Sequence, residues 1–301
     1  MPSTFEFVSA DGTRLRGWSN DGAGPPLVVS NGLGTIPQMW PSLSHADSGY
    51  STFTWYYRGT FGSDRPGDPA RVRVRDYAED LVALMDARGI DRALIAGWSL
   101  GVDVGFEVAQ RHPDRVAGLL AVAGIPGGTF TTMGAPLRIP TWFRRPLAVA
   151  VARLGRRSGP ALNWLAPRMP LDRRTAWLLS HSGFMLPGAD PDVLVAAMAE
   201  FLRQDWGWYY ALALAATEHC PLDLSLVQCP TTLLVARQDV LTSIHAMLDA
   251  AATIPDARTL VLSSSHFVPL EHPDVVVDAL AALVRRCSLN VDRLHVADIY
   301  P

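Results

Sequence analysis

Lysine is absent from this sequence, and all 26 basic residues are arginine. The absence excludes a lysine nucleophile, a Schiff base with a carbonyl substrate and a Walker-type phosphate-binding lysine. Cysteine is scarce: Cys220, Cys229 and Cys287 are the only three, and their spacing is not that of a metal site. We therefore expect reduced structural cysteines rather than a disulfide framework.

Long apolar runs are missing too. None reaches the roughly 18–20 residues that a membrane-spanning helix needs. The first residues lack the basic and then apolar regions of a signal peptide, so a cytoplasmic location is expected. The net charge is −3 and no nucleic-acid-binding module is recognisable, which argues against a nucleic-acid partner. A chain of 301 residues, 49% apolar and 18% charged, is typical of one large globular domain or a domain with an insertion.

Strand and helix patterns alternate over most of the chain. Short apolar or β-rich runs indicate strands at 5–9, 14–19, 27–30, 52–57, 93–96, 116–123, 231–236 and 259–262. Helical patterns are found at 74–87, 100–111, 243–252 and 274–286. Such alternation predicts an α/β fold in which helices cover both faces of a mostly parallel sheet.

The alternation is interrupted between residues 125 and 220, a stretch rich in proline, arginine and tryptophan. Amphipathic helical pieces lie at 147–154, 175–179 and 193–202. About a hundred residues are too many for an ordinary loop. We therefore predict a helical subdomain at 125–220, inserted into a core made of residues 1–124 and 221–287. Residues 288–301 form a tail with a weak pattern.

The most informative motif is Gly97-Trp98-Ser99-Leu100-Gly101. It follows an apolar run and precedes a helical pattern, which is the strand–turn–helix setting of a nucleophile elbow. Glycines at both flanking positions let the strand and helix backbones approach closely. The turn would expose the Ser99 hydroxyl at a helix N-terminus, where backbone N–H groups and the helix dipole favour developing negative charge. We predict that Ser99 is a nucleophile.

A serine nucleophile needs a histidine base and an acid that orients the histidine. In hydrolases with this elbow the chain order is serine, acid, histidine. His266 follows the last predicted strand and Asp239 follows the strand before it, and ligands meet an open α/β sheet at such strand ends. His272 is the main rival of His266. Asp239 could instead cap the following helix, and Asp249 and Asp256 are alternatives that end no strand.

An oxyanion hole requires backbone N–H groups aimed at the developing negative charge. With an elbow of this type, one comes from the residue after the nucleophile, here Leu100, and the other from the loop after the third strand. That loop is Asn31-Gly32-Leu33-Gly34, and its candidate donor is Leu33. A plain glycine turn is the alternative interpretation of the loop.

With these pieces placed, the chain resembles the α/β-hydrolase fold superfamily, specifically its capped esterase, lipase and haloperoxidase-like branch. The resemblance covers about residues 4–123 and 221–286. Besides the motifs above, it is carried by Arg58-Gly59-Thr60-Phe61-Gly62-Ser63 and by Ser265-His266-Phe267. It implies a sheet of the eight-stranded type and a mobile helical cap over the site, which matches residues 125–220.

Two positions depart from relatives within that superfamily. Asn31 stands where many carry the histidine of a His-Gly pair, so side-chain contacts near the oxyanion hole are expected to differ. Ser99 stands where the epoxide hydrolases and dehalogenases carry the aspartate that forms an alkyl-enzyme ester. The chain therefore resembles the serine enzymes of the superfamily.

Together these residues predict a serine hydrolase that cleaves a carboxylic ester, or a related acyl bond, of an apolar small molecule through an acyl-enzyme. The chemistry requires no metal or organic cofactor. A carbon–carbon bond hydrolase, a thioesterase, a lactonase or a perhydrolase would use the same triad. A non-catalytic ligand-binding protein on this scaffold is the alternative from another class.

Aromatic side chains of the predicted cap bear on the substrate. They could form the core of the cap itself or line an apolar acyl pocket. The candidate pocket residues are Trp142 and Trp206 from the cap, with Trp98 and Phe267 from the core.

Basic side chains are concentrated in the same part of the chain. Nine arginines lie between Arg138 and Arg174, where Asp172 is the only acidic residue. A solvated face would account for them. They could also recruit an anionic substrate such as a CoA ester, or dock the protein at an acidic lipid surface with Trp142, Phe143 and the apolar run 147–149 as apolar partners.

Overall fold

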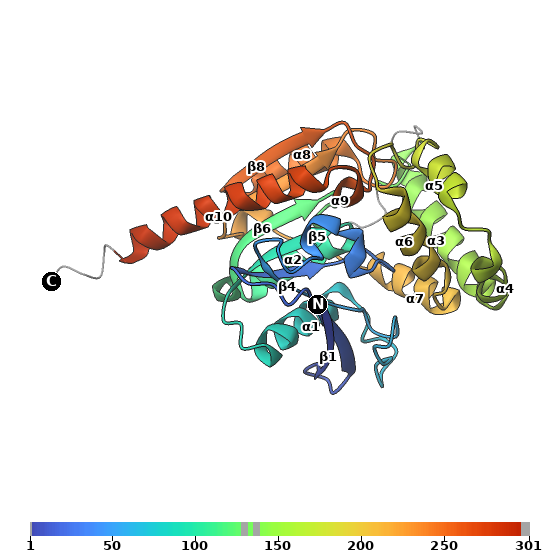
Figure 1. Ribbon diagram of the computed structural model, residues 1–301, viewed down its shortest axis with the longest axis horizontal. Coiled ribbons are helices and arrows are strands. Elements are labelled where there is room, and N and C mark those ends of the chain that lie inside the picture. The colour runs from blue at the N-terminus through green and yellow to red at the C-terminus, as the bar shows by residue number, and fades with distance from the viewer. Residues whose placement is uncertain (1, 128–131, 135–138, 296–301) are drawn as a thin grey trace.

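The computed structural model describes residues 2–127, 132–134 and 139–295. Its centre is an eight-stranded sheet with the order β1-β2-β4-β3-β5-β6-β7-β8 (Figure 1). The strands are β1 (Ser3–Val8), β2 (Arg14–Ser19), β3 (Pro26–Ser30), β4 (Ser51–Trp55), β5 (Ala93–Trp98), β6 (Val116–Val122), β7 (Thr231–Ala236) and β8 (Ala257–Leu262). The strands from β4 to β8 in this order run parallel, while β2 pairs antiparallel with β1 and β4. The predicted fold class is confirmed.

The helices form two groups (Figure 1). Those that alternate with the strands are α1 (Val74–Ala87), α2 (Leu100–Arg111), α8 (Ile244–Thr253), α9 (Val268–Glu271) and α10 (Pro273–His295). The second group lies between β6 and β7 in the chain: α3 (Thr141–Arg157), α4 (Gly159–Leu165), α5 (Arg173–Ser180), α6 (Pro191–Leu202) and α7 (Trp206–Ala216). Short 3-10 turns occur at 37–39, 41–43, 113–115, 166–168 and 224–226. The second group sits together at one end of the molecule, beside the sheet.

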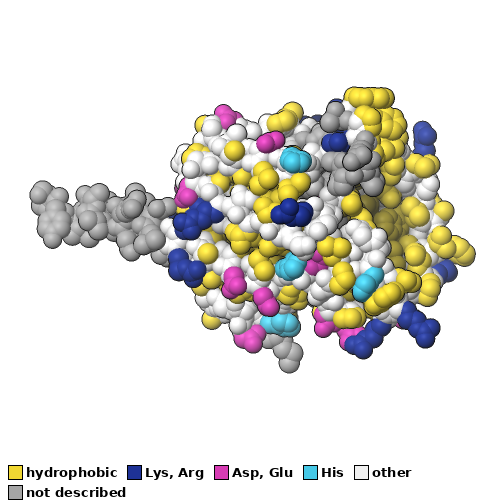
Figure 2. Space-filling view, turned by 90° about the horizontal axis from the view of Figure 1, so that it is seen from above, with side chains coloured by type: hydrophobic (Ala, Val, Ile, Leu, Met, Phe, Trp, Pro, Cys, Tyr) yellow, Lys and Arg dark blue, Asp and Glu magenta, His cyan; other side chains and the backbone are white. Residues whose placement is uncertain are grey.

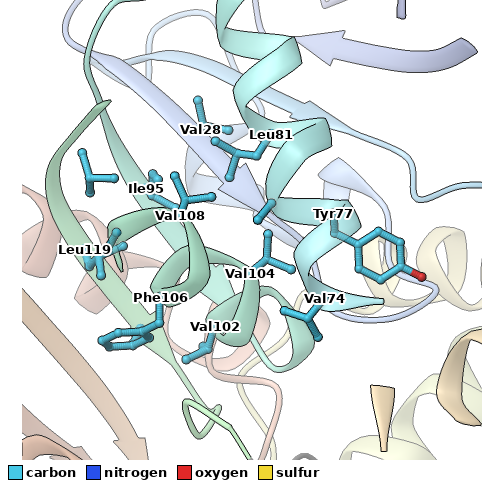
Figure 3. Close-up of a cluster of buried hydrophobic side chains, with 14 of the residues drawn as sticks. Val28, Val74, Tyr77, Leu81, Ile95, Val102, Val104, Phe106, Val108 and Leu119 are labelled. Atoms are coloured by element: carbon cyan, nitrogen blue, oxygen red, sulfur yellow. The ribbon is translucent and has the colours of Figure 1, made fainter. Parts of the chain in front are cut away.

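Helices cover both faces of the sheet. Alternate residues of a strand point to opposite sides, so each strand contributes apolar side chains to both faces. Val28 of β3 packs with Leu81 of α1 and Val104 of α2 in one buried cluster (Figure 3). Its neighbour Leu27 belongs to a second cluster that includes Leu280 of α10. The sheet is therefore a central layer between helices, as its near-continuous apolar strands require.

Arg58, in the loop after β4, holds separate segments of the core together through its buried guanidinium. The Arg58 guanidinium is fully buried, with Nη2 2.6 Å from Asp80 of α1 and Nη1 2.5 Å from Asp11 in the β1–β2 turn. Nη1 also donates to the carbonyl of Arg71 at 2.8 Å. One side chain thus joins the first hairpin, the loop after β4 and the first helix.

Three helices were not anticipated from the sequence pattern, and α3 and α10 are markedly longer than predicted. α4, α7 and the single turn of α9 lie outside the predicted helical pieces. The last helix, α10, extends to His295 rather than ending near Arg286, so the first part of the predicted tail is helical. Among the described residues, none of the helices combines the length and apolar character needed to cross a bilayer.

Candidate active site

Ser99 occupies a strained turn between β5 and α2. Its backbone angles are φ 55° and ψ −120°, a conformation that a side chain bearing a Cβ rarely adopts. The turn places Ser99 immediately before the first residue of α2, where the unpaired N–H groups of a helix N-terminus are found. This is the geometry that the elbow motif predicts, and strain of this kind is characteristic of functional sites.

The two motif glycines are required by close backbone contacts. A Cβ at Gly97 would overlap the carbonyl of Gly101, and a Cβ at Gly101 would overlap the carbonyl of Ser30 at the end of β3. Gly32, in the loop after β3, is also packed against the serine, since a Cβ there would lie 3.4 Å from the Cβ of Ser99. The loop after β3 and the elbow are therefore held side by side.

Asp239 and His266 are brought together by the ends of β7 and β8. His266 Nδ1 lies 2.8 Å from Asp239 Oδ2, and the two residues are 4% and 2% exposed. The other carboxylate oxygen, Oδ1, accepts the backbone N–H groups of Leu241 at 2.7 Å and Thr242 at 2.9 Å. An ionised carboxylate only accepts hydrogen bonds, so this pairing favours a proton on Nδ1 and leaves Nε2 of His266 as the free base.

The loop that carries His266 is fixed from two sides. Trp98 Nε1, next to the serine, donates to the carbonyl of His266 at 2.8 Å. The buried carboxylate of Glu271 accepts from the Ser264 hydroxyl at 2.7 Å and from the Ser265 backbone N–H at 2.9 Å. It also accepts the N–H of Leu186, 2.7 Å away in the connection between α5 and α6. Sequence reasoning missed Glu271, because an acid beside a His-Pro pair carries no motif.

A cavity of about 390 Å³ opens between the sheet and the inserted helices. Ser99, His266, Leu33 and Leu100 all line it. Its walls are predominantly apolar, with Trp98, Met39 and Phe267 from the core side and Leu179, Phe184, Leu194, Met198, Phe201 and Tyr209 from α5–α7 and their connections. The predicted nucleophile, base and oxyanion-hole residues thus face one apolar chamber.

Within the described residues, the His266 ring forms its hydrogen bond with Asp239 and none with the Ser99 hydroxyl. Hydrogen bonds between a nucleophile and its base often tighten only in the substrate complex. No backbone acceptor among the described residues takes the N–H of Leu33, and Leu100 is the first residue of α2, where N–H groups lack an intrahelical partner. Leu33 and Leu100 both line the chamber, so their N–H groups stay the candidate oxyanion donors.

Two of the four predicted pocket residues lie elsewhere. Trp98 and Phe267 line the chamber, with ring centroids 5.9 Å apart. Trp142, near the start of α3, is 76% exposed and packs edge-on against Phe143. Trp206 is buried among the rings of Phe201, Tyr209 and Tyr210, so it belongs to the core of the inserted helices. Three aromatic residues that line the chamber were not among the predicted pocket residues: Phe184, Phe201 and Tyr209, all from the inserted segment.

The rival residues stand away from this chamber. His272 is the cap of the short α9 and its Nε2 lies 3.2 Å from the Ser263 carbonyl. Asp256 pairs with Arg286 at 2.6 Å, and Asp249 is an exposed residue of α8. The described part of the chain contains no cluster of three or more histidine, cysteine or acidic side chains placed to hold a metal ion.

The comparisons agree with this architecture. A family model for the alpha/beta hydrolase fold matches residues 25–273, and the chain belongs to this family. It is 33% identical over 111 residues to "Putative carbamate hydrolase RutD" of Caulobacter segnis, a match that covers 36% of this chain and 41% of that protein. The chain therefore aligns with less than half the length of that relative.

Solved structures match over nearly the whole chain. A thermophilic esterase from Thermogutta terrifontis has a TM-score of 0.70 at 22% identity, covering 95% of this chain and 99% of that one. The enol-lactonase from Burkholderia xenovorans LB400 has a TM-score of 0.71 at 22% identity, covering 93% and 100%. At such identity the likeness concerns the fold. The family match and these structures together define the alpha/beta hydrolase fold of this chain.

Proposed function

We propose that this protein is a serine hydrolase that cleaves a carboxylic ester, or a related acyl bond, of an apolar small molecule. The observation that carries the proposal is the Asp239–His266 hydrogen bond of 2.8 Å, made at the wall of the apolar chamber that Ser99 also lines. A buried acid–histidine pair beside a strained serine is the arrangement that activates a hydroxyl nucleophile.

The first half of the reaction forms an acyl-enzyme. As the Ser99 oxygen attacks the carbonyl carbon, His266 Nε2 takes the hydroxyl proton, and Asp239 stabilises the imidazolium through Nδ1. The carbonyl oxygen becomes an oxyanion that the N–H groups of Leu33 and Leu100 bind. When the tetrahedral intermediate collapses, the bond to the leaving alkoxide breaks and His266 returns the proton to it, releasing the alcohol.

Water completes the cycle. His266 removes a proton from water as it attacks the acyl-enzyme, and the carbonyl oxygen again carries the negative charge in the oxyanion hole. Collapse breaks the bond to the Ser99 oxygen, which takes the proton back from His266, and the carboxylic acid leaves. No further group is needed to balance either half.

The walls of the chamber favour an apolar acyl or alcohol group. Leu194, Met198 and Phe201 of α6 face the same space as Ser99, and a pocket of about 390 Å³ falls within the range of small-molecule sites. We propose that residues 125–220 act as the cap over the site, because α5–α7 and their connections supply much of the lining. Cap side chains would then set the size of substrate that fits.

A panel of esters tests the proposal. We expect measurable hydrolysis of aryl esters by the wild type, a preference for a particular acyl length, and loss of activity in S99A and H266Q. Lactones and thioesters assayed alongside distinguish a lactonase or thioesterase on the same triad. If folded S99A hydrolysed the preferred ester as fast as the folded wild type, the serine mechanism would be contradicted.

A further inference from the structure

Helix α3 is packed with its small residues inward. Ala148, Ala152 and Gly155 are buried, and they recur at the spacing of one helical face. A Cβ at Gly155 would overlap the ring of Tyr210 on α7, so the two helices meet at close range along this face. The inward face of α3 therefore leaves no room for its larger side chains.

The large apolar residues of α3 point to solvent instead. Phe143, Val151 and Leu154 are all exposed, Leu154 to 66%, and with Leu147 they follow a spacing of three or four residues along one side of the helix. An amphipathic helix in a globular protein normally turns this stripe toward the core. In α3 the stripe is on the outside.

The same character extends beyond α3. Ten of the fifteen exposed large hydrophobic side chains among the described residues lie between Trp142 and Phe184. They include Trp164 near the end of α4 and Leu178 on α5. Figure 2 shows hydrophobic side chains gathered over the end of the molecule where these helices lie, with basic side chains around its margin. Exposed apolar side chains gathered on one region of a protein surface indicate a site of contact with a partner or a membrane.

The arginines of the segment are largely uncompensated. Of those described between residues 144 and 174, only Arg173 forms an ion pair with a described carboxylate, Asp192, at 2.6 Å. Arg153, Arg157 and Arg174 are exposed and form no ion pair within the described chain. Positive charge therefore accompanies the exposed apolar side chains, and only a minority of it is balanced by nearby acids such as Asp172 and Asp192.

The combination selects one kind of partner. A second copy meeting this surface through the same face would place arginines against arginines, which is unfavourable. An anionic lipid surface supplies negative headgroups for the arginines and a hydrocarbon boundary for tryptophan and leucine, as in helices that lie in the membrane interface. We propose that the segment 142–184 docks this protein onto anionic lipid surfaces.

The docking surface adjoins the chamber. Phe184 is 41% exposed, lines the chamber and lies 5.4 Å from the ring of Phe267. A molecule that leaves the lipid surface at this edge would meet the chamber wall directly. Docking through the exposed surface does not require the proposed hydrolytic chemistry.

Vesicle binding tests the inference. The full-length protein is sedimented with vesicles of phosphatidylcholine alone or of phosphatidylcholine with phosphatidylglycerol, at low and at physiological salt. We expect binding to the anionic vesicles only, weakened by salt because exposed charges are screened. The variant R153Q/R157Q/R174Q should lower the partition coefficient by roughly 100-fold, since each basic residue near an anionic surface contributes a similar factor of about five.

Matched variants separate docking from a general loss of charge or fold. R75Q/R237Q/R258Q removes the same charge from exposed arginines outside the segment and should bind as the wild type does. W164S/L154S/L178S should lose binding, whereas L226S, at an exposed leucine outside the segment, should not. Circular dichroism and hydrolysis of a short soluble ester check folding and chemistry independently of lipid.

Three outcomes would overturn the inference. They are failure to bind anionic vesicles at low salt, equal loss of binding in the two arginine variants, and a wild-type dimer that W164S/L154S/L178S converts to monomer. The last result would assign the surface to a second copy of the chain.

Discussion

Asp239 divides its two carboxylate oxygens between two tasks. Oδ2 forms the hydrogen bond with His266 Nδ1, while Oδ1 accepts two backbone N–H groups of its own loop. The bonds to Oδ1 fix the orientation of the carboxylate and so aim Oδ2 at His266. These backbone bonds stabilise the loop and are not the helix cap that the sequence left open, because α8 begins at Ile244 with Ser243 at its N-cap position. Both tasks are possible for one side chain because a carboxylate can accept hydrogen bonds on each oxygen.

Replacing Asp239 with asparagine tests this division. D239N keeps the size of the side chain but can present an amide N–H to His266 and so favour the wrong tautomer, for which a loss of about 10⁴ in kcat is typical. Hydrolysis of the preferred aryl ester would be measured against D256N, which alters an acid outside the chamber and should retain wild-type kcat. A D239N enzyme within tenfold of the wild type would show that Asp239 does not orient the base.

Among the secondary-structure elements, the loop after β4 contributes to stability through the buried ion pairs of Arg58. Arg58 lies at the centre of contacts among the β1–β2 turn, the loop after β4 and α1, and Asp80 is as buried as the arginine. Burial and the pairing act in opposite directions on the arginine, and the hydrogen bond and charge of Asp80 together raise the pKa of Arg58 above its usual value. Removing the cation leaves the buried Asp80 carboxylate without its ion pair, whereas Asp11 keeps Arg71 at 3.5 Å.

We expect R58M to lower the free energy of unfolding by about 3–5 kcal/mol, the usual cost of breaking a buried ion pair from one side. Urea denaturation followed by circular dichroism measures it. R75M, at an exposed position of α1 without an ion pair in the described chain, is the control and should change stability by less than about 0.5 kcal/mol. A loss below about 1 kcal/mol in R58M would mean that solvent or a rearranged acid replaces the pairing.

Elements with a clear period could be predicted from the sequence, and those without one could not. Strand alternation and the face of α1 located the sheet and its flanking helices, and the order of strand ends placed Ser99, Asp239 and His266 near one another. α7 escaped prediction because its sequence, WGWYYALALAA, is apolar on every side and has no face to detect. Trp142 was misplaced for the opposite reason: α3 has a clear stripe, but the stripe faces solvent rather than the chamber.

At the scale of the whole molecule, the inserted helices meet the core at a crowded junction. Gly127, where the chain leaves the core, has a φ of 82°, and its N–H donates to Asp103 Oδ1 at 2.6 Å. A Cβ at Gly127 would overlap Pro221, where the chain returns from the inserted helices to the core. His219, on the same return, is mostly buried with Nε2 3.8 Å from Asp103 Oδ1. Burial lowers the pKa of His219 below its usual 6.5, more strongly than the charge of Glu107 raises it.

This junction predicts a stability loss in acid. As pH falls, the unfolded chain takes up a proton at His219 near the ordinary pKa, before the folded chain does. The contribution of neutral His219 to the free energy of unfolding is therefore complete above the unfolded-state pKa and is lost as pH falls through the lower folded-state pKa. H219Q should therefore shrink the drop in Tm between about pH 7.5 and about pH 5.5. H245Q, at an exposed histidine of α8, should keep the wild-type drop. An unchanged drop in H219Q would contradict the assignment.

Covalent labelling shows whether Ser99 is the nucleophile. The folded protein is incubated with a fluorophosphonate, which captures serines activated by a base, and the modified peptide is identified by mass spectrometry. We expect one phosphonate per chain, attached to Ser99, with labelling abolished in S99A and strongly slowed in H266Q. A folded wild-type protein that stays unlabelled at Ser99, while the probe labels a serine hydrolase in the same tube, would contradict the account.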